Sequence, residues 1–187
     1  MYQQVRSVAQ LQLQQDFVDY INMLISDYKE SKIVIVGSSD MTSGLNEEEI
    51  NILKELGLQV NFSDASKNAY IAIIDDGEIL YEALSNRQLS YEGICGSNKI
   101  KLYSASWWKN SVDSSNASIR IGNSEYVYGG NGIHILVYDE KRNLILDSVC
   151  FDTSSEYHFA VRSDSITNKL MEEFEQYSIE MEDKLDN

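Results

Sequence analysis

The fold is decided by a stretch that reads Asn116-Ala-Ser-Ile-Arg-Ile-Gly-Asn-Ser-Glu-Tyr126, then Gly129-Gly-Asn-Gly-Ile-His-Ile-Leu-Val-Tyr-Asp139, and that ends in Asp147-Ser-Val-Cys-Phe-Asp-Thr153. The apolar side chains of Ile133-His-Ile-Leu-Val137 alternate, as they do in a β-strand with one buried face. Polar residues 138–143 then predict a hairpin turn, after which the chain returns as another strand. This stretch therefore predicts an antiparallel sheet.

The same stretch resembles the interleukin-like EMT inducer (ILEI) domain, also called the PANDER-like domain. The resemblance rests on three motifs in the family's order: a strand pair, a Gly-x-Gly-Ile strand at Gly130–Ile133 that leads into a hairpin, and a closing Ser-x-x-Phe-Asp-Thr motif at Ser148–Thr153. It implies an α+β fold, a sandwich of two antiparallel β-sheets with flanking helices. It also implies a domain that binds a partner and does not catalyse.

The first half of the chain resembles the later half of the same domain, so the halves stand in swapped order. Either the domain is circularly permuted, or the chain begins and ends inside neighbouring copies of a tandem array. We predict one permuted ILEI-like domain over residues 1–164 and a C-terminal helical extension over residues 165–187.

Periodicity and turn residues place the individual elements. A loop is expected over residues 85–98, which contain two glycines. Helices are expected over 8–30, over 46–57 with Asn46 as the cap, and over 165–185. Strands are expected at Lys32–Gly37, Gln59–Ser63, Ala69–Ile74, Glu78–Leu84, Lys99–Ser106, Ala117–Ile121, Glu125–Tyr128, Gly132–Asp139 and Asn143–Phe151.

The composition narrows the class of protein. With 15 basic and 30 acidic residues the net charge is −15, which disfavours a nucleic-acid partner because the phosphate backbone would be repelled. No apolar run is long enough to span a membrane, and the glutamine-rich N-terminus lacks the apolar core of a secretory signal. We therefore expect a cytoplasmic or virion protein. Cys95 and Cys150 form one disulfide or two buried thiols, and we favour reduced thiols.

Residue patterns that carry catalysis are missing. The loop Ser38–Gly44 follows a strand but has no phosphate-loop lysine, and no serine lies in a nucleophile elbow. Neither His134 nor His158 has a second ligand at metal-binding spacing, so we predict no metal and no cofactor. His134 alternates with Ile133 and Ile135, which predicts that it faces solvent. We expect that the chain is not an enzyme.

Tandem tryptophans, Trp107 and Trp108, provide flat rings that suit stacking against a sugar face, although packing into the core is the alternative. In one stem domain of the ILEI family, a β-linked N-acetylglucosamine is held by an aspartate after the Ile-Val-Ile-Val-Gly-type strand and by an arginine. Asp40 matches the aspartate, whereas the arginine's place is a serine within Phe62-Ser-Asp64. Lys67 lies close enough in sequence to substitute. The predicted ligand-binding residues are Asp40, Asp64, Lys67, Trp107 and Trp108.

We predict a non-catalytic carbohydrate-binding or accessory module of bacterial or phage type, with a glycan or a protein as its partner. The alternative is a structural or interaction subunit of a bacterial surface or phage virion assembly, in which the helical ends make contacts and the chain forms a defined homo-oligomer. A third possibility, an α/β enzyme, requires a parallel sheet within residues 32–84.

Overall fold

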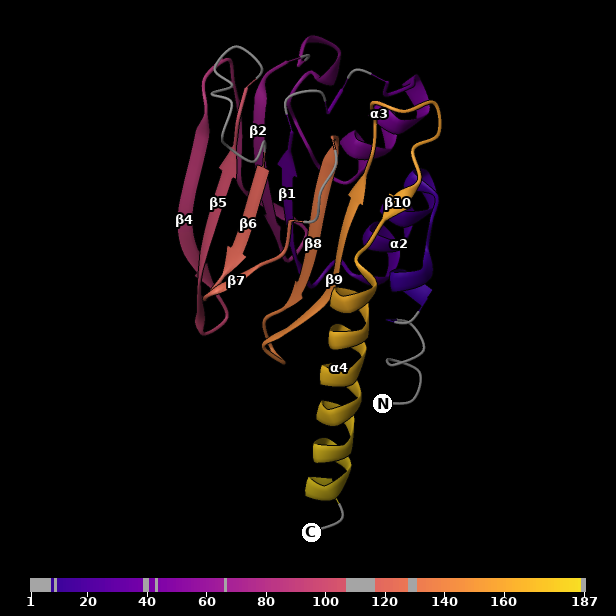
Figure 1. The fold of residues 1–187 in the computed structure, drawn as a ribbon, viewed down its shortest axis with the longest axis vertical. Helices are drawn as coiled ribbons and strands as arrows, with labels where there is room; N and C mark the ends of the chain where they lie inside the picture. The colour runs from indigo at the N-terminus through magenta and orange to yellow at the C-terminus, as the bar shows by residue number, and fades with distance from the viewer. Residues whose placement is uncertain are drawn as a thin grey trace.

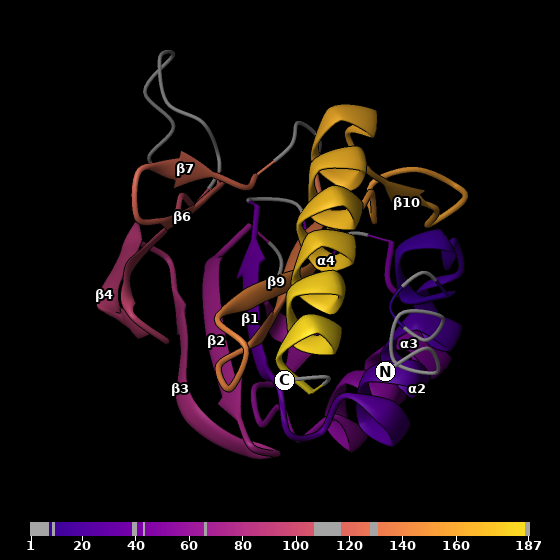
Figure 2. The ribbon, with the colours of Figure 1, turned by 90° about the horizontal axis from the view of Figure 1, so that it is seen from below.

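The fold is taken from a computed structural model, which describes residues 8, 10–38, 41–42, 44–65, 67–106, 117–127 and 131–185. Two antiparallel sheets and one helical layer stack into a mixed α+β sandwich (Figures 1 and 2). The large sheet has the strand order β10-β9-β8-β1-β2-β3, and the small sheet has the order β4-β5-β6-β7. The strands are β1 Lys32–Gly37, β2 Ala69–Asp75, β3 Glu78–Ser85, β4 Leu89–Cys95, β5 Asn98–Ser104, β6 Ala117–Ile121, β7 Ser124–Glu125, β8 Ile133–Asp139, β9 Leu144–Phe151 and β10 Ala160–Val161.

The large sheet is the middle layer, and its four inner strands, β9, β8, β1 and β2, are buried on both faces. β1 lies between β2 and β8, and all six of its residues are buried, as its continuous β-branched run predicts. One face packs on the helices α2 (Phe17–Asp27) and α3 (Glu47–Glu55), through side chains such as Ile33 and Ile35. The other face packs on the small sheet through Val34 and Val36. The strands within residues 32–84 pair antiparallel, so the parallel sheet that an α/β enzyme requires is not present in the described part of that segment.

The hairpin predicted over residues 138–143 is confirmed, and a second hairpin joins β2 to β3. Asp76 and Gly77 join β2 to β3 with φ angles of 50° and 77°, the left-handed pair of a tight two-residue turn. Asn143, at φ 54°, ends the turn from β8 into β9. Gly132 enters β8 at φ 141°, and a Cβ there would lie 2.0 Å from the carbonyl oxygen of Phe151, so only glycine fits this bend.

The predicted N-terminal helix over 8–30 is interrupted. Residues 10–13 are helical, the helix stops over residues 14–16, and α2 starts afresh at Phe17. The side chain of Asp16 caps α2, because it accepts a hydrogen bond from the backbone N–H of Asp19, which has no partner within the helix. The prediction for α3 is confirmed, with Asn46 and Glu49 forming a reciprocal capping box.

Three element predictions are wrong. The strand predicted over Glu125–Tyr128 does not include Tyr126 or Val127, because β7 spans only Ser124–Glu125. Residues 59–63 do not form a strand, and Phe62–Asp64 is a 3-10 turn (η1). The carboxylate of Glu82 accepts hydrogen bonds from the backbone N–H groups of Gln59 and Val60. The predicted loop over 85–98 contains β4, because pairing with β5 gives Leu89 and the residues after it a neighbour that local sequence does not reveal.

His134 is also not where the sequence places it. The residue is 3% exposed, and its Nε2 atom lies 3.8 Å from Sγ of Cys150. The alternation is as predicted, but the face opposite Ile133 and Ile135 is covered as well. A strand in a middle layer has no solvent side, which a single strand's pattern does not show.

The last helix, α4 (Asp164–Leu185), packs its first half on β9 through Leu170 and Phe174 and then extends beyond the sandwich (Figure 1). The division between residues 1–164 and 165–187, and the swapped order of the two halves, stay predictions. In the described part of the chain, no helix combines the length and apolarity needed to cross a membrane.

Candidate functional site

The strands that lead into the predicted ligand-binding residues finish at one end of the sandwich. We call this the loop end, and define it by Gly37, Tyr70, Ser104 and Phe151. Gly37 pairs with Tyr70 on β2, and Ile133, its partner on β8, pairs with Phe151 on β9. The hydroxyl of Ser104 on the small sheet donates to the carbonyl of Gly37 and accepts from the backbone N–H of Tyr70. This buried serine ties the two sheets together at the loop end.

Only part of the predicted site can be placed. Asp40, Trp107 and Trp108 lie outside the described residues. Asp64 is the last residue of η1, and only its backbone is described. Lys67 is exposed and has a left-handed φ of 65° in the turn before β2. The binding roles of all five residues stay predictions.

A second group of side chains at the loop end was not predicted. After β9 the chain turns at Asp152, whose side chain accepts hydrogen bonds from Ser154, and then runs on to β10. Its side chains alternate from residue 157. His158, Ala160 and Arg162 face the protein, where they contact Glu49, the helix-side core and Asp147 respectively. Between them, the side chains that face outward are Tyr157, Phe159 and Val161, exposed by 64%, 58% and 38%.

The outward rings of Tyr157 and Phe159 are stacked. Their centroids are 5.6 Å apart, and the ring planes differ by 8°. They rim a hollow of about 440 Å³, which we call the aromatic hollow. Among the described residues that line it there is no lysine or arginine. Its lining consists of Asp16, Phe17, Gly44, Asn46, Glu49, Ser155, Glu156, Tyr157, His158 and Phe159.

The wall of the aromatic hollow holds a fixed imidazole. Nδ1 of His158 lies 2.5 Å from Oε1 of Glu49, and both side chains are almost fully buried. The other oxygen of Glu49 accepts the backbone N–H of Asn46 at 2.9 Å, so the carboxylate is held from both sides. A carboxylate only accepts hydrogen bonds, so Nδ1 carries a proton and Nε2 is left for another partner.

Gly44 brings the loop after β1 against this wall. A Cβ at this position would lie 2.3 Å from the carbonyl oxygen of Thr153 and 2.9 Å from Nε2 of His158. The hydroxyl of Thr153 in turn donates to the carbonyl of Met41. The loop in which the ILEI resemblance places a sugar-binding aspartate therefore packs directly on the segment that carries the stacked rings.

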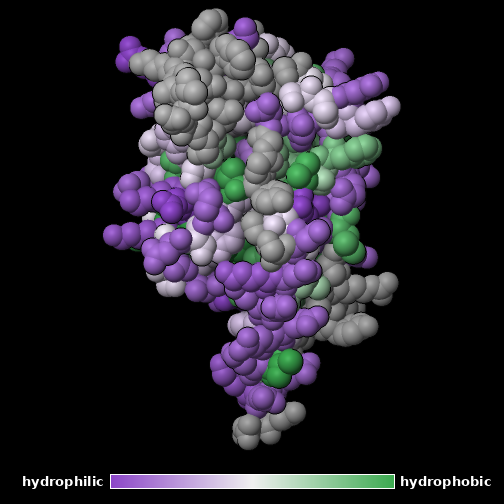
Figure 3. Space-filling model, viewed as in Figure 1, coloured by the Kyte–Doolittle hydropathy of each residue, from purple (hydrophilic) through white to green (hydrophobic). Residues whose placement is uncertain are grey.

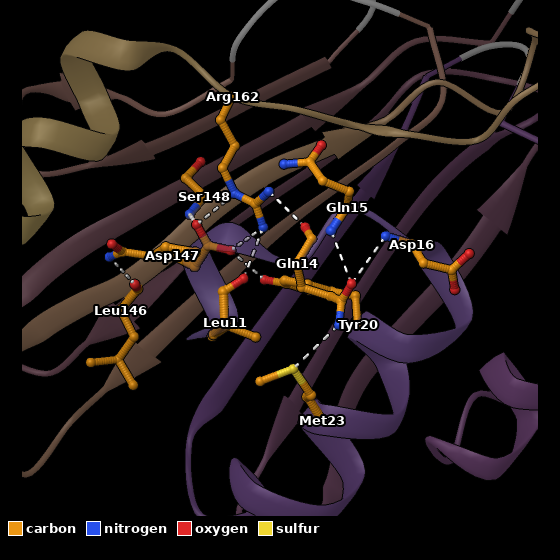
Figure 4. A network of polar contacts seen from close by, with 11 residues as sticks. Leu11, Gln14, Gln15, Asp16, Tyr20, Met23, Leu146, Asp147, Ser148 and Arg162 are labelled. Atoms are coloured by element: carbon orange, nitrogen blue, oxygen red, sulfur yellow. Dashed lines mark hydrogen bonds and ion pairs between the residues drawn. The ribbon is translucent and has the colours of Figure 1, made fainter. Parts of the chain in front are cut away.

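A buried ion pair holds that segment in place from the other side (Figure 4). Arg162 and Asp147 are joined by hydrogen bonds of 3.0 and 3.3 Å, and the hydroxyl of Tyr20 donates to Asp147 at 2.8 Å. The same guanidinium donates to the carbonyls of Leu11 and Gln14, where the N-terminal helix stops. It thereby ties three separate segments of the chain together.

Burial raises the pKa of Asp147, while Arg162, Tyr20 and the backbone N–H of Ser148 each favour the carboxylate. Burial, and then the charge of Asp147, raise the pKa of Tyr20. Since every partner in this cluster lies within the protein, we assign the cluster a structural role. It holds β10 and residues 157–161, which we call the aromatic segment, in place.

The remaining reactive side chains are buried. Cys95 and Cys150 are free thiols, and burial raises the pKa of each to about 12. This confirms two buried thiols over one disulfide. No group of three or more histidine, cysteine or acidic side chains within the described residues is arranged to hold a metal ion.

Sequence reasoning missed the aromatic hollow although a signal was present. Tyr157, Phe159 and Val161 alternate with less apolar neighbours directly after a polar turn. The segment is too short to be recognised as a strand, and its partners Asp16 and Glu49 come from helix starts far away in sequence.

A comparison of the chain with protein-family models, curated proteins and solved structures finds no match.

Proposed function

We propose that this chain is a non-catalytic carbohydrate-binding module of the ILEI/PANDER-like type, and that the aromatic hollow is its glycan site. The observation that carries the proposal is the stacked and exposed pair Tyr157 and Phe159 at the rim of a polar hollow. The architecture supports it, since two antiparallel sheets with helices outside are what the resemblance implies.

The aromatic pair suits a sugar because a pyranose has an apolar C–H face and a polar edge. Two aromatic rings that lie parallel and side by side offer a flat surface long enough for such a face. Large exposed aromatic side chains are uncommon on a surface without a partner, and burying one contributes about 1.5–3 kcal/mol. Stacking on both rings would contribute about 3–6 kcal/mol before the cost of association, so this pair alone would give weak binding in about the millimolar range.

The polar lining supplies hydrogen bonds for the hydroxyl groups at the sugar's edge. Glu156 is exposed, and Asp16 uses Oδ1 for the helix cap. Nε2 of His158 lies beside Gly44 in the wall, while Nδ1 contacts Glu49. Because the lining has three carboxylates and no described cation, the preferred ligand is a neutral or amino sugar and not a uronic or sialic acid.

The test is a glycan array followed by calorimetric titration of the strongest ligand. Tyr157→Ala and Phe159→Ala are each expected to weaken binding by roughly five- to thirtyfold, which corresponds to about 1–2 kcal/mol. Leu80→Ala is the matched control, since this residue is also 58% exposed but lies on β3, at the opposite edge of the large sheet. Folded protein that retains no glycan above background refutes the proposal, as do aromatic variants that bind the glycan as tightly as the unaltered protein does.

A further inference from the structure

The far half of α4 is a second feature that the glycan site does not use. Of the described side chains in this helix, none beyond Phe174 is buried. Residues 175–185 nevertheless continue as a helix of about 16 Å at the standard rise per residue. Figure 1 shows this part extending away from both sheets and from α2 and α3.

The far half carries an apolar row on one face. Leu170, Phe174, Tyr177 and Met181 follow one another at spacings of four, three and four, which places them on the same side of a helix. The first two are buried against the protein, whereas Tyr177 and Met181 are half-buried. The row by which α4 packs on β9 therefore continues past the body of the protein.

The charge around this row is mainly negative, since residues 175–185 carry four acidic side chains and one basic one, Lys184. Residues 172–183 contain six acidic side chains and no basic one, and Figure 3 shows the projecting part as a hydrophilic surface with one hydrophobic spot. Glu182 and Asp183 lie in the last turns, where the helix dipole already presents negative charge. Helical segments of this length are marginal in water without packing, and these charges weaken it further. A basic surface would relieve both effects.

We propose that the far half of α4 is a docking helix for a basic protein partner, which receives Tyr177 and Met181 in an apolar groove flanked by lysine or arginine. A second copy of this chain fits poorly, because two such far halves would each bring four carboxylates and only one lysine, and their net negative charges would repel each other. The mode is an amphipathic helix laid into a groove. It does not depend on the glycan site, which lies at the other end of the molecule in Figure 1.

The probe is a synthetic amphipathic helical peptide of about three heptads, with leucine at the a and d positions and lysine at e and g. Fluorescence anisotropy should show saturable binding to the full chain that weakens at high ionic strength. The double variant Tyr177→Ser, Met181→Ser is expected to weaken it about tenfold or more. Ile179→Ser is the matched control, since Ile179 is exposed on the opposite face of α4.

A peptide with the same core and glutamate at e and g should not bind. Amide hydrogen exchange on the same samples should show that the lysine peptide slows exchange over residues 175–185, and that the double variant keeps α4 in the free protein. The proposal is overturned if the glutamate peptide binds equally, if the double variant binds like the wild type, or if light scattering shows a dimer that the double variant abolishes.

Discussion

Replacing Arg162 with methionine tests the assignment of the buried ion pair as the clamp that positions the aromatic segment. Methionine fills a similar volume but removes five N–H donors. In the variant, the carboxylate of Asp147, which is 1% exposed, loses its only charged partner among the contacts described. The carbonyl of Gln14 loses a donor as well, and that of Leu11 keeps only the backbone N–H of Gln14. Breaking a buried pair from one side costs about 3–5 kcal/mol.

For a chain of this size, a loss of 3–5 kcal/mol lowers the midpoint of thermal unfolding by roughly 10 °C. Urea denaturation followed by circular dichroism would give the free energy directly. The double variant Arg162→Met, Asp147→Leu is expected to be at least ~1 kcal/mol more stable than the single one, because no uncompensated charge stays buried. A single variant that loses less than about 1 kcal/mol, or a double variant that is less stable still, would refute the reasoning.

The pH dependence supplies an independent check with a definite sign. Arg162 lowers the pKa of Asp147, so removing it raises that pKa further above the unfolded value of about 3.9. The folded variant then holds more protons than the unfolded chain, and its stability increases as the pH falls. The stability gap between the variant and the wild type should therefore narrow as the pH falls from neutral through the raised pKa of Asp147 in the variant. A gap that stays constant would show that the buried charge is not the cause.

Three further outcomes follow from local geometry. The two buried thiols should react with a disulfide reagent only upon unfolding; rapid labelling of native protein would contradict their burial and their pKa of about 12. Gly44→Ala should destabilise the protein by roughly 1–3 kcal/mol in urea, because its Cβ meets the backbone of Thr153, whereas Gly93→Ala meets only a side chain and should cost less. The hydrogen bond from Lys32 lowers the pKa of Glu140 below its unfolded value of about 4.5. The stability that this pair contributes is therefore present above about pH 4.5 and is lost as the pH falls through the folded pKa. Glu140→Gln should reduce the loss of unfolding free energy on the acid side of a plot of stability against pH.

Local sequence determined most of the strands and two of the helices. The β-branched run of β1 and the alternation in β8 and β9 predict their elements because strand formation there follows side-chain period alone. Asn46 and Glu49 predict the start of α3 because a capping box is a contact between residues three apart. The errors over residues 59–63 and 85–98 have a common cause, since β4 exists only through pairing with β5 and residues 59–60 bond to Glu82.

Only the tertiary structure decided which faces are buried and where a site lies. His134 is buried because its strand has a layer on each side, a property of the stack that the strand's own residues do not encode. The aromatic hollow joins the starts of α2 and α3 to a turn more than a hundred residues later. Sequence proximity carries no record of such distant contacts, because packing and not chain order brings Asp16, Glu49 and Tyr157 together. The sequence alone determined the antiparallel character of this protein, and the packing of its layers decided which side chains are buried and which face solvent.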